Sequence, residues 1–129
     1  MVLDQFVDNA RRYRILNELG SGGYARVFLC RDRIQRDLCA VKVANRLGDE
    51  SLLREARGLR FLSHPGVVRV REVGEDARGR LFLVMDYLEG PTLFDFLDFH
   101  RKLPAFVASQ LTFEIADALE IIHREGLVH

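Results

Sequence analysis

The sequence predicts an α+β fold in which a five-stranded antiparallel sheet with one helix precedes a helical part. Five short apolar runs with strand-like composition occur before residue 88. A helical pattern separates the third run from the fourth, and after Pro91 the apolar residues recur at helical spacing. We therefore expect a polar lead-in over residues 1–12, either a short helix or a loose segment, a sheet-based part over 13–88, and a helical part over 89–129.

The first three strands span residues 13–19, 25–31 and 38–44, where apolar and β-branched residues are bounded by glycine or polar residues. A helix over 49–62 follows, because acidic residues precede its first turn and the run at 64–66 contains proline and glycine. Strands over 67–73 and 80–87 complete the sheet. The apolar stripe of the helix consists of Leu52, Ala56, Leu59 and Leu62.

Beyond the sheet the chain is predicted to be helical. Thr92 and Asp95 have the spacing of a capping box for a short helix to about His100. Pro104 opens a long amphipathic helix over 104–125, which Gly126 ends. An exposed apolar stripe needs a partner, so we expect self-association through this helix if nothing else covers it. The stripe consists of Val107, Leu111, Ile115, Ala118, Leu119 and Ile122.

The composition argues against several classes of function. The 129 residues include 19 basic and 19 acidic side chains, so no bulk attraction to nucleic acid or to a membrane surface is expected. No apolar run approaches the length of a membrane span, and residues 1–8 do not resemble a signal peptide, which favours the cytoplasm. Cys30 and Cys39 are interpreted as buried thiols, with a disulfide or metal ligation as the alternative. The four histidines lack metal-ligand spacing, and no metal site is expected.

Three glycines lie within residues 20–23, at the tip of the first predicted hairpin. Glycine allows backbone N–H groups to approach a ligand closely, and phosphate is the ligand most often held in this way. An ordinary flexible turn is the alternative. A dinucleotide-binding fingerprint does not fit because a strand follows the glycines, and a Walker loop does not fit because Gly-Lys-Ser/Thr is absent.

Lys42 places an ammonium group within the apolar strand 38–44, where it costs free energy unless an anion meets it. Glu55 lies at the edge of the apolar stripe of the following helix, which predicts an ion pair between the two side chains. The alternative is a solvent-exposed Glu55 with no fixed partner. The phosphate of a ligand is the second candidate anion for Lys42.

In their order and spacing, these motifs resemble the protein kinase family, and specifically the bacterial eukaryotic-like serine/threonine kinases. The run over 20–27 resembles the glycine-rich loop, with Ala25 in place of the third glycine, and the run over 40–43 resembles the V-A-I-K strand. Glu55 lies where the family has the helix glutamate that pairs with this lysine. The runs over 64–68, 84–90 and 123–129 resemble the turn after that helix, the hinge and the approach to the catalytic loop. The resemblance implies a kinase N-lobe over 13–88, followed by the hinge end and the start of an incomplete C-lobe over 89–129.

The resemblance implies ATP as the bound nucleotide. The glycine loop would fold over its phosphates, and Lys42, held by Glu55, would contact the α- and β-phosphates. Met85 would be the gatekeeper residue, and the backbone of Asp86 and Leu88 would hydrogen-bond the adenine edge. Thr92 could approach the ribose, although its capping role already explains it. The implied adenine-pocket residues are Leu19, Val27 and Ala40, and the remaining implied nucleotide-binding residues are Gly20, Ser21, Gly22, Gly23, Lys42, Met85, Asp86 and Leu88.

His129 matches the family's histidine that precedes the catalytic aspartate, but that aspartate and the Mg²⁺ ligands have no counterpart in the sequence. Mg²⁺ is therefore implied only for a full kinase domain, and we expect no phosphoryl transfer by this chain alone. One hypothesis is the N-terminal part of a serine/threonine kinase that acts on a protein substrate. The other is a naturally truncated, non-catalytic module that binds a nucleotide or a partner. The intact residues Gly20, Gly22, Lys42 and Glu55 favour the first.

Overall fold

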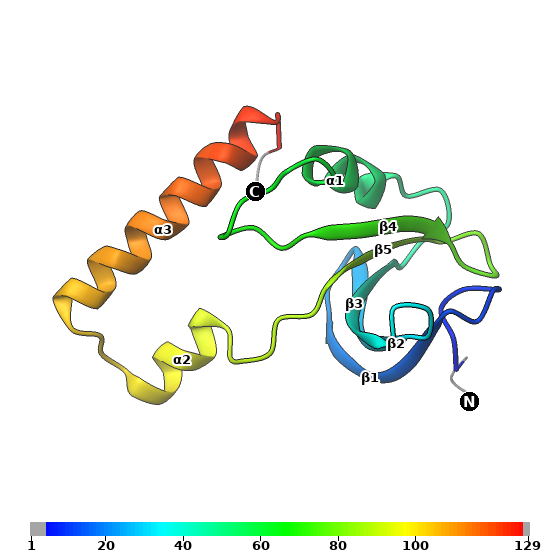
Figure 1. Cartoon of the computed structure of the whole chain (residues 1–129), viewed down its shortest axis with the longest axis horizontal. Helices are drawn as coiled ribbons and strands as arrows, with labels where there is room; N and C mark the ends of the chain where they lie inside the picture. Colours follow the sequence, from blue (N-terminus) through cyan, green and yellow to red (C-terminus); the bar gives the residue numbers. More distant parts are fainter. Residues whose placement is uncertain (1–4, 128–129) are drawn as a thin grey trace.

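A curled five-stranded antiparallel sheet forms one part of the molecule, and two helices extend from it as a second part (Figure 1). The structure is a computed structural model and describes residues 5–127. The α+β class and the five-stranded sheet predicted from the sequence are confirmed. The strand order is β1-β2-β3-β5-β4, formed by β1 (Tyr13–Ser21), β2 (Ala25–Asp32), β3 (Asp37–Ala44), β4 (Val70–Glu75) and β5 (Leu81–Asp86).

The largest apolar cluster covers the face of the sheet to which Val41 and Val43 of β3 point. Successive residues of a strand point to opposite faces, so the intervening Lys42 lies on the other face. Cys30 and Cys39 are directly opposite each other in β2 and β3 within this cluster, and both are free thiols. Burial raises the pKa of Cys30 to about 12 and that of Cys39 to about 11, so both remain protonated at neutral pH. This confirms the interpretation of the two cysteines as buried thiols.

Helix α1 (Ser51–Leu59) packs on the face that carries Lys42. Leu52 is buried with Ala25 and Ala44, and Ala56 is buried with Val70 and Leu83, so the predicted apolar stripe faces the sheet. The helix is shorter than the predicted 49–62. Its start is set by the side chain of Asp49, which accepts a hydrogen bond from the N–H of Ser51 at 2.9 Å. Its end is set by a turn in which the N–H of Leu62 donates to the carbonyl of Leu59.

Two strands differ from the prediction by two or more residues at an end, and the other three differ by one residue. β1 continues through Gly20 and Ser21, because these residues still pair with Val27 and Arg26 of β2. β4 begins at Val70 instead of residue 67, because the N–H of Val67 donates to the carbonyl of His64 and closes a turn there. The apolar run at 67–70 did not reveal this turn.

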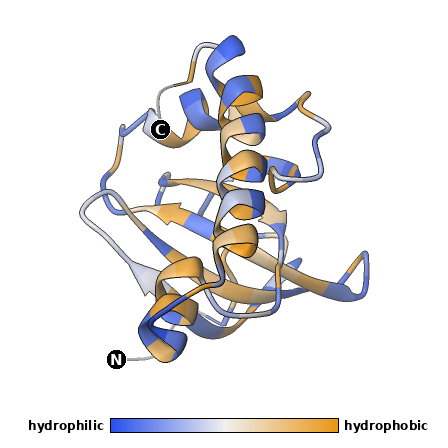
Figure 2. Cartoon of the chain, turned by 90° about the vertical axis from the view of Figure 1, so that its left-hand side faces the viewer, coloured by the Kyte–Doolittle hydropathy of each residue, from blue (hydrophilic) through white to orange (hydrophobic). Residues whose placement is uncertain are grey.

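Helices α2 (Leu93–His100) and α3 (Ala105–Arg124) form the second part. The side chain of Thr92 accepts a hydrogen bond from the N–H of Asp95 at 3.1 Å, which confirms the predicted N-cap. Gly126, with a φ of +81°, follows the end of α3. Hydrophobic residues occur along both helices (Figure 2), and among the described residues of α3 only Ala118 is buried. No helix among residues 5–127 is both long and apolar enough to cross a membrane.

The lead-in adds to the edge of the sheet. Residues 5–12 form no helix; instead Phe6 makes an antiparallel bridge with Arg14, and Val7 is buried in the largest apolar cluster. The carboxylate of Asp8 accepts hydrogen bonds from the N–H groups of Arg12 and Tyr13. The segment therefore belongs structurally to the sheet.

Candidate functional site

The ion pair predicted between Lys42 and Glu55 is present. The ammonium of Lys42 in β3 lies 3.1 Å from Oε2 and 3.3 Å from Oε1 of Glu55 in α1. The two side chains are 30% and 36% exposed, so the pair is accessible to a ligand. Its position follows from the packing of α1, because Leu52 and Ala56 on either side of Glu55 are buried against the sheet.

A row of directly opposed residues runs to Lys42 from residues 20–23, which we call the glycine segment. Gly20 in β1 pairs with Val27 in β2, Val27 pairs with Lys42 in β3, and Lys42 pairs with Leu83 in β5. Directly opposed residues of an antiparallel sheet share a face. Gly20, Val27 and Lys42 therefore lie on one face of three neighbouring strands.

A second row lies two residues further along the same face. Leu29 in β2 pairs with Ala40 in β3, and Ala40 pairs with Met85 in β5. Val27, Ala40 and Met85, three of the predicted nucleotide-binding residues, thus share the face of Lys42. Leu29 was not among them, although its position two residues after Val27 in a strand indicates the same face.

The glycine segment is open toward solvent. A Cβ atom added to Gly20 or Gly23 would meet no atom of the protein within 4 Å, and neither residue has a positive φ. The fold itself therefore does not require glycine at these two positions. The segment is held at its base, where the N–H of Gly22 donates to the carbonyl of Ala25 at 2.9 Å, and Asn45 Nδ2 donates to the carbonyl of Gly22 at 2.9 Å. Asn45 belongs to none of the motifs recognised in the sequence.

Two further predicted residues lie at the margins of this face. Leu19 is located at the irregularity in β1 between Glu18 and Gly20 and is 43% exposed. Leu88, two residues beyond the end of β5, is 71% exposed. Covering exposed leucines with an apolar group is favourable, because it removes apolar surface from water.

Lys42 and Glu55 also border a cavity of about 970 Å³ between α1 and residues 122–127. The glycine segment does not line this cavity. Outside this cavity, α3 is tied to the turn before β4. His64 Nε2 lies 2.9 Å from Oδ2 of Asp117 in α3, and His64 Nδ1 accepts a hydrogen bond from the N–H of Gly66. Residues 5–127 contain no group of three or more histidine, cysteine or acidic side chains placed to hold a metal ion. His129 lies outside the described residues.

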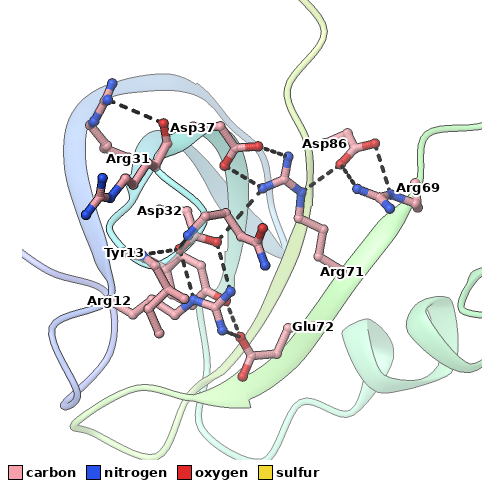
Figure 3. Close-up of polar contacts among 12 residues, drawn as sticks. Arg12, Tyr13, Arg31, Asp32, Asp37, Arg69, Arg71, Glu72 and Asp86 are labelled. Atoms are coloured by element: carbon pink, nitrogen blue, oxygen red, sulfur yellow. Dashed lines mark hydrogen bonds and ion pairs between the residues drawn. The ribbon is translucent and has the colours of Figure 1, made fainter.

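A cluster of charged side chains lies at the end of the sheet where β5 leaves it (Figure 3). We call it the strand-end cluster. Asp32, which is fully buried, accepts two hydrogen bonds from the guanidinium of Arg12, at 3.0 Å each. Burial alone raises the pKa of Asp32, but hydrogen bonds from Arg12 and from two backbone N–H groups outweigh it and hold the pKa below its usual range. The cluster consists of Arg12, Asp32, Asp37, Arg69, Arg71, Glu72 and Asp86.

No sequence signal indicates this cluster. Its members come from the lead-in, from the hairpin between β2 and β3, from β4 and its approach, and from the end of β5, so only the pairing of the strands brings them together. The hydroxyl of Tyr13 joins the cluster by donating to the carboxylate of Glu72. Burial and this carboxylate raise the pKa of Tyr13 above its usual value.

The chain is similar in sequence to protein kinases. The protein kinase domain model matches residues 13–129. A probable serine/threonine-protein kinase PknB of Lactococcus lactis subsp. lactis (strain IL1403) is 34% identical over 127 residues, which cover 93% of this chain and 20% of the relative. A probable serine/threonine-protein kinase of Clostridium perfringens, CPE1738, is 35% identical over 126 residues, covering 92% of this chain and 18% of the relative. The chain thus spans about one fifth of the length of these curated relatives.

Two solved structures resemble this chain over nearly all of its length. The crystal structure of Rad53 1–466 in complex with AMP-PNP matches with a TM-score of 0.81 at 26% identity, covering 93% of this chain and 32% of that chain. The kinase domain of Mycobacterium tuberculosis PknI, in a form with one cysteine replaced by alanine, matches with a TM-score of 0.78 at 26% identity, covering all of this chain and 55% of that chain. The chain therefore belongs to the protein kinase family, and within it to the bacterial eukaryotic-like serine/threonine kinases.

Proposed function

We propose that this chain is the ATP-binding N-terminal part of a serine/threonine protein kinase catalytic domain. The parent reaction would transfer the γ-phosphate of ATP to a serine or threonine hydroxyl of a protein substrate. The observation that carries the proposal is the Lys42–Glu55 ion pair, with both oxygens of Glu55 within 3.3 Å of the ammonium. This pair holds a cation on the same face of the sheet as the glycine segment, and polyphosphate is the ligand class that such an arrangement suits.

The glycine segment supports the same ligand. Since neither backbone conformation nor crowding demands glycine at Gly20 and Gly23, close approach of a ligand is the remaining physical reason for small residues there. In the proposal, residues 20–23 cover the phosphates with their N–H groups and Lys42 contacts the α- and β-phosphates.

The base would lie over the second row of residues on this face. Val27, Ala40 and Leu19 would line the adenine pocket, and Met85 would be the gatekeeper residue. The main chain of Asp86 and Leu88 would hydrogen-bond the adenine edge. Covering Leu19 and Leu88, which are 43% and 71% exposed, would contribute to affinity.

The remaining parts of the reaction are assigned to the longer protein. Mg²⁺ would be held by residues of a full kinase domain, since residues 5–127 supply no ligand set for it. The protein substrate likewise belongs to the parent enzyme. A cytoplasmic location is part of the proposal, because ATP is available there and the reducing conditions match the free thiols of Cys30 and Cys39.

Calorimetric titration of the purified chain with ATP and ADP tests the proposal. Lys42→Met removes the cation that meets the phosphates, so we expect binding to weaken by about tenfold or more, the value of one charge-assisted contact. Glu55→Gln keeps the shape of the side chain but weakens its contact with Lys42. We expect it to reduce the affinity for the nucleotide less than Lys42→Met does. Lys102→Met is the matched control, because Lys102 is the only other lysine and is exposed between α2 and α3. Equal affinities for the Lys42 variant, the Lys102 variant and the wild type would refute the nucleotide site.

A further inference from the structure

Arg71 occupies the centre of the strand-end cluster, between Asp37 and Asp86 (Figure 3). Its Nε donates to Oδ1 of Asp86 at 2.7 Å, and its two terminal nitrogens donate to the two oxygens of Asp37 at 2.9 and 2.8 Å. The side chain is only 16% exposed. All three nitrogens of a planar, rigid guanidinium thus donate to carboxylates, which fixes the positions of the Asp37 and Asp86 side chains.

Asp86 is the last residue of β5 and is held through both its main chain and its side chain. Its N–H donates to the carbonyl of Arg69 at 3.0 Å. The guanidinium of Arg69 also reaches the carboxylate, at 3.2 and 3.3 Å, but it is 69% exposed and an exposed pair contributes little. The shorter and better buried contact of Arg71 is therefore the main side-chain restraint on Asp86.

The carboxylate of Asp86 and the proposed adenine pocket lie on opposite faces of the sheet. Asp86 pairs with Cys39, whose side chain is in the largest apolar cluster, whereas the adjacent Met85 pairs with Ala40 on the face of Lys42. Arg71 consequently cannot touch a nucleotide bound on the Lys42 face. It can influence the nucleotide only through the main chain at the end of β5.

Stability alone is a weak explanation for the contact between Arg71 and Asp86. Taking charges out of water costs free energy, and apolar residues of similar volume often stabilise a fold as well as a buried ion pair does. The neighbouring positions of β5 are already secured by Val84, which is fully buried, and by main-chain pairing on both sides. The ion pair additionally fixes the orientation of Asp86, the last residue of β5.

We propose that Arg71 is a positioning residue for adenine recognition. By clamping the carboxylate of Asp86, it would fix the main-chain carbonyl of Asp86 where this group accepts a hydrogen bond from the 6-amino group of adenine. The inference rests on the proposed nucleotide site and deepens it, because it assigns preference for a base with a 6-amino donor to a side chain that does not contact the base.

Two ligands and two arginine variants of the full chain test this role. The ligands are ATP and purine riboside 5′-triphosphate, which lacks the 6-amino group. Arg71→Met should weaken ATP binding by about five- to tenfold, the value of one hydrogen bond, and leave the affinity for the analogue within about twofold. Arg12→Met is the control, because Arg12 belongs to the same cluster but does not contact Asp86. It should lower stability through the buried Asp32 but preserve the preference for ATP.

Amide hydrogen exchange gives a readout that needs no nucleotide. Arg71→Met should speed exchange of the Asp86 N–H, whereas Arg12→Met should not. Asp86→Asn serves as a second variant if Arg71→Met unfolds, and should also reduce the preference for ATP. The positioning role would be overturned if Arg71→Met reduced the affinity for both ligands equally. It would also be overturned if the two arginine variants had equal effects on the preference for ATP and on exchange of the Asp86 N–H. Failure of the wild type to bind either ligand would overturn the proposed function and the adenine part of this inference, while the exchange data would still decide whether Arg71 restrains Asp86.

Discussion

Asp32 shows how a single buried charge is accommodated in this sheet. Its carboxylate is fully buried, and it is satisfied by the guanidinium of Arg12 and by the N–H groups of Ile34 and Gln35 at 3.0 and 3.1 Å. Removing one partner of such a group leaves an uncompensated charge, which costs far more than an exposed ion pair is worth. At the residue scale, the strand-end cluster is therefore most sensitive at Asp32.

Replacing Asp32 by asparagine should lower stability and change its dependence on pH. The folded-state pKa of Asp32 lies below the unfolded value of about 3.9, so its contribution is complete above about pH 4 and is lost as the pH falls through the folded-state pKa. We expect Asp32→Asn to cost about 3 kcal/mol at pH 7 and to flatten the acid limb of the stability curve. Urea unfolding between about pH 2 and 7 measures both effects. Asp98→Asn, at an exposed position of α2, is the control, and parallel acid limbs for Asp32→Asn and wild type would contradict the assignment.

At the scale of elements, the pairing of β4 with β5 depends on a small residue opposite a large one. Gly74 in β4 is directly opposed to Phe82 in β5, and a Cβ atom at Gly74 would meet the ring of Phe82. Phe82 is buried in the largest apolar cluster and packs edge-on against Tyr13, with ring centroids 6.0 Å apart. The ring therefore has little freedom to move aside.

Gly74→Ala should accordingly destabilise the fold by about 1–3 kcal/mol, the usual cost of overpacking. Equilibrium urea unfolding at neutral pH gives the measurement. Gly20→Ala provides the matched control within the same sheet, because a Cβ atom there meets nothing within 4 Å and its effect on stability should stay within about 0.5 kcal/mol. A Gly74 variant as stable as the wild type would show that Phe82 can move after all.

At the scale of the whole molecule, the sheet part and the two-helix part differ in how well their apolar side chains are buried. The sheet buries its apolar residues on both faces, whereas α2 and α3 expose large aromatic side chains. The four most exposed of these on the two helices are Phe94, Phe99, Phe106 and Phe113, between 68% and 83% exposed. Since the chain spans 55% of the matched PknI kinase domain, we propose that the remaining lobe of a longer protein covers these side chains.

The isolated chain should therefore self-associate, because apolar side chains without a covering partner find one in another copy. Sedimentation velocity over a range of concentrations should show species larger than the monomer. The double variant Phe106→Asp and Phe113→Asp on α3 should shift the equilibrium toward monomer by about tenfold or more. Phe61→Asp is the control, because Phe61 is 88% exposed but lies after α1, outside the two helices. A monomeric wild type at all concentrations would contradict the prediction.

The sequence by itself determined the elements and the residues with distinctive local chemistry. The lone lysine within an apolar strand, the glycines at 20–23, the glutamate at the edge of a helix stripe and the cap at Thr92 are each visible within a few neighbouring residues. Val27 and Ala40 were assigned to a nucleotide pocket only through the resemblance to protein kinases, and their place on the face of Lys42 follows from the register of the strands.

Only the tertiary structure decided which strands are neighbours and in what register. The rows from Gly20 to Lys42 and from Leu29 to Met85 depend on irregular pairing in β1 and on the insertion of β5 between β3 and β4. The contacts of Arg71 with Asp37 and Asp86 join residues 34 and 15 positions apart, and nothing local distinguishes this arginine from the others. The physical reason is that alternation assigns a side chain to a face, whereas its neighbours across strands are set by pairing and packing of the whole sheet.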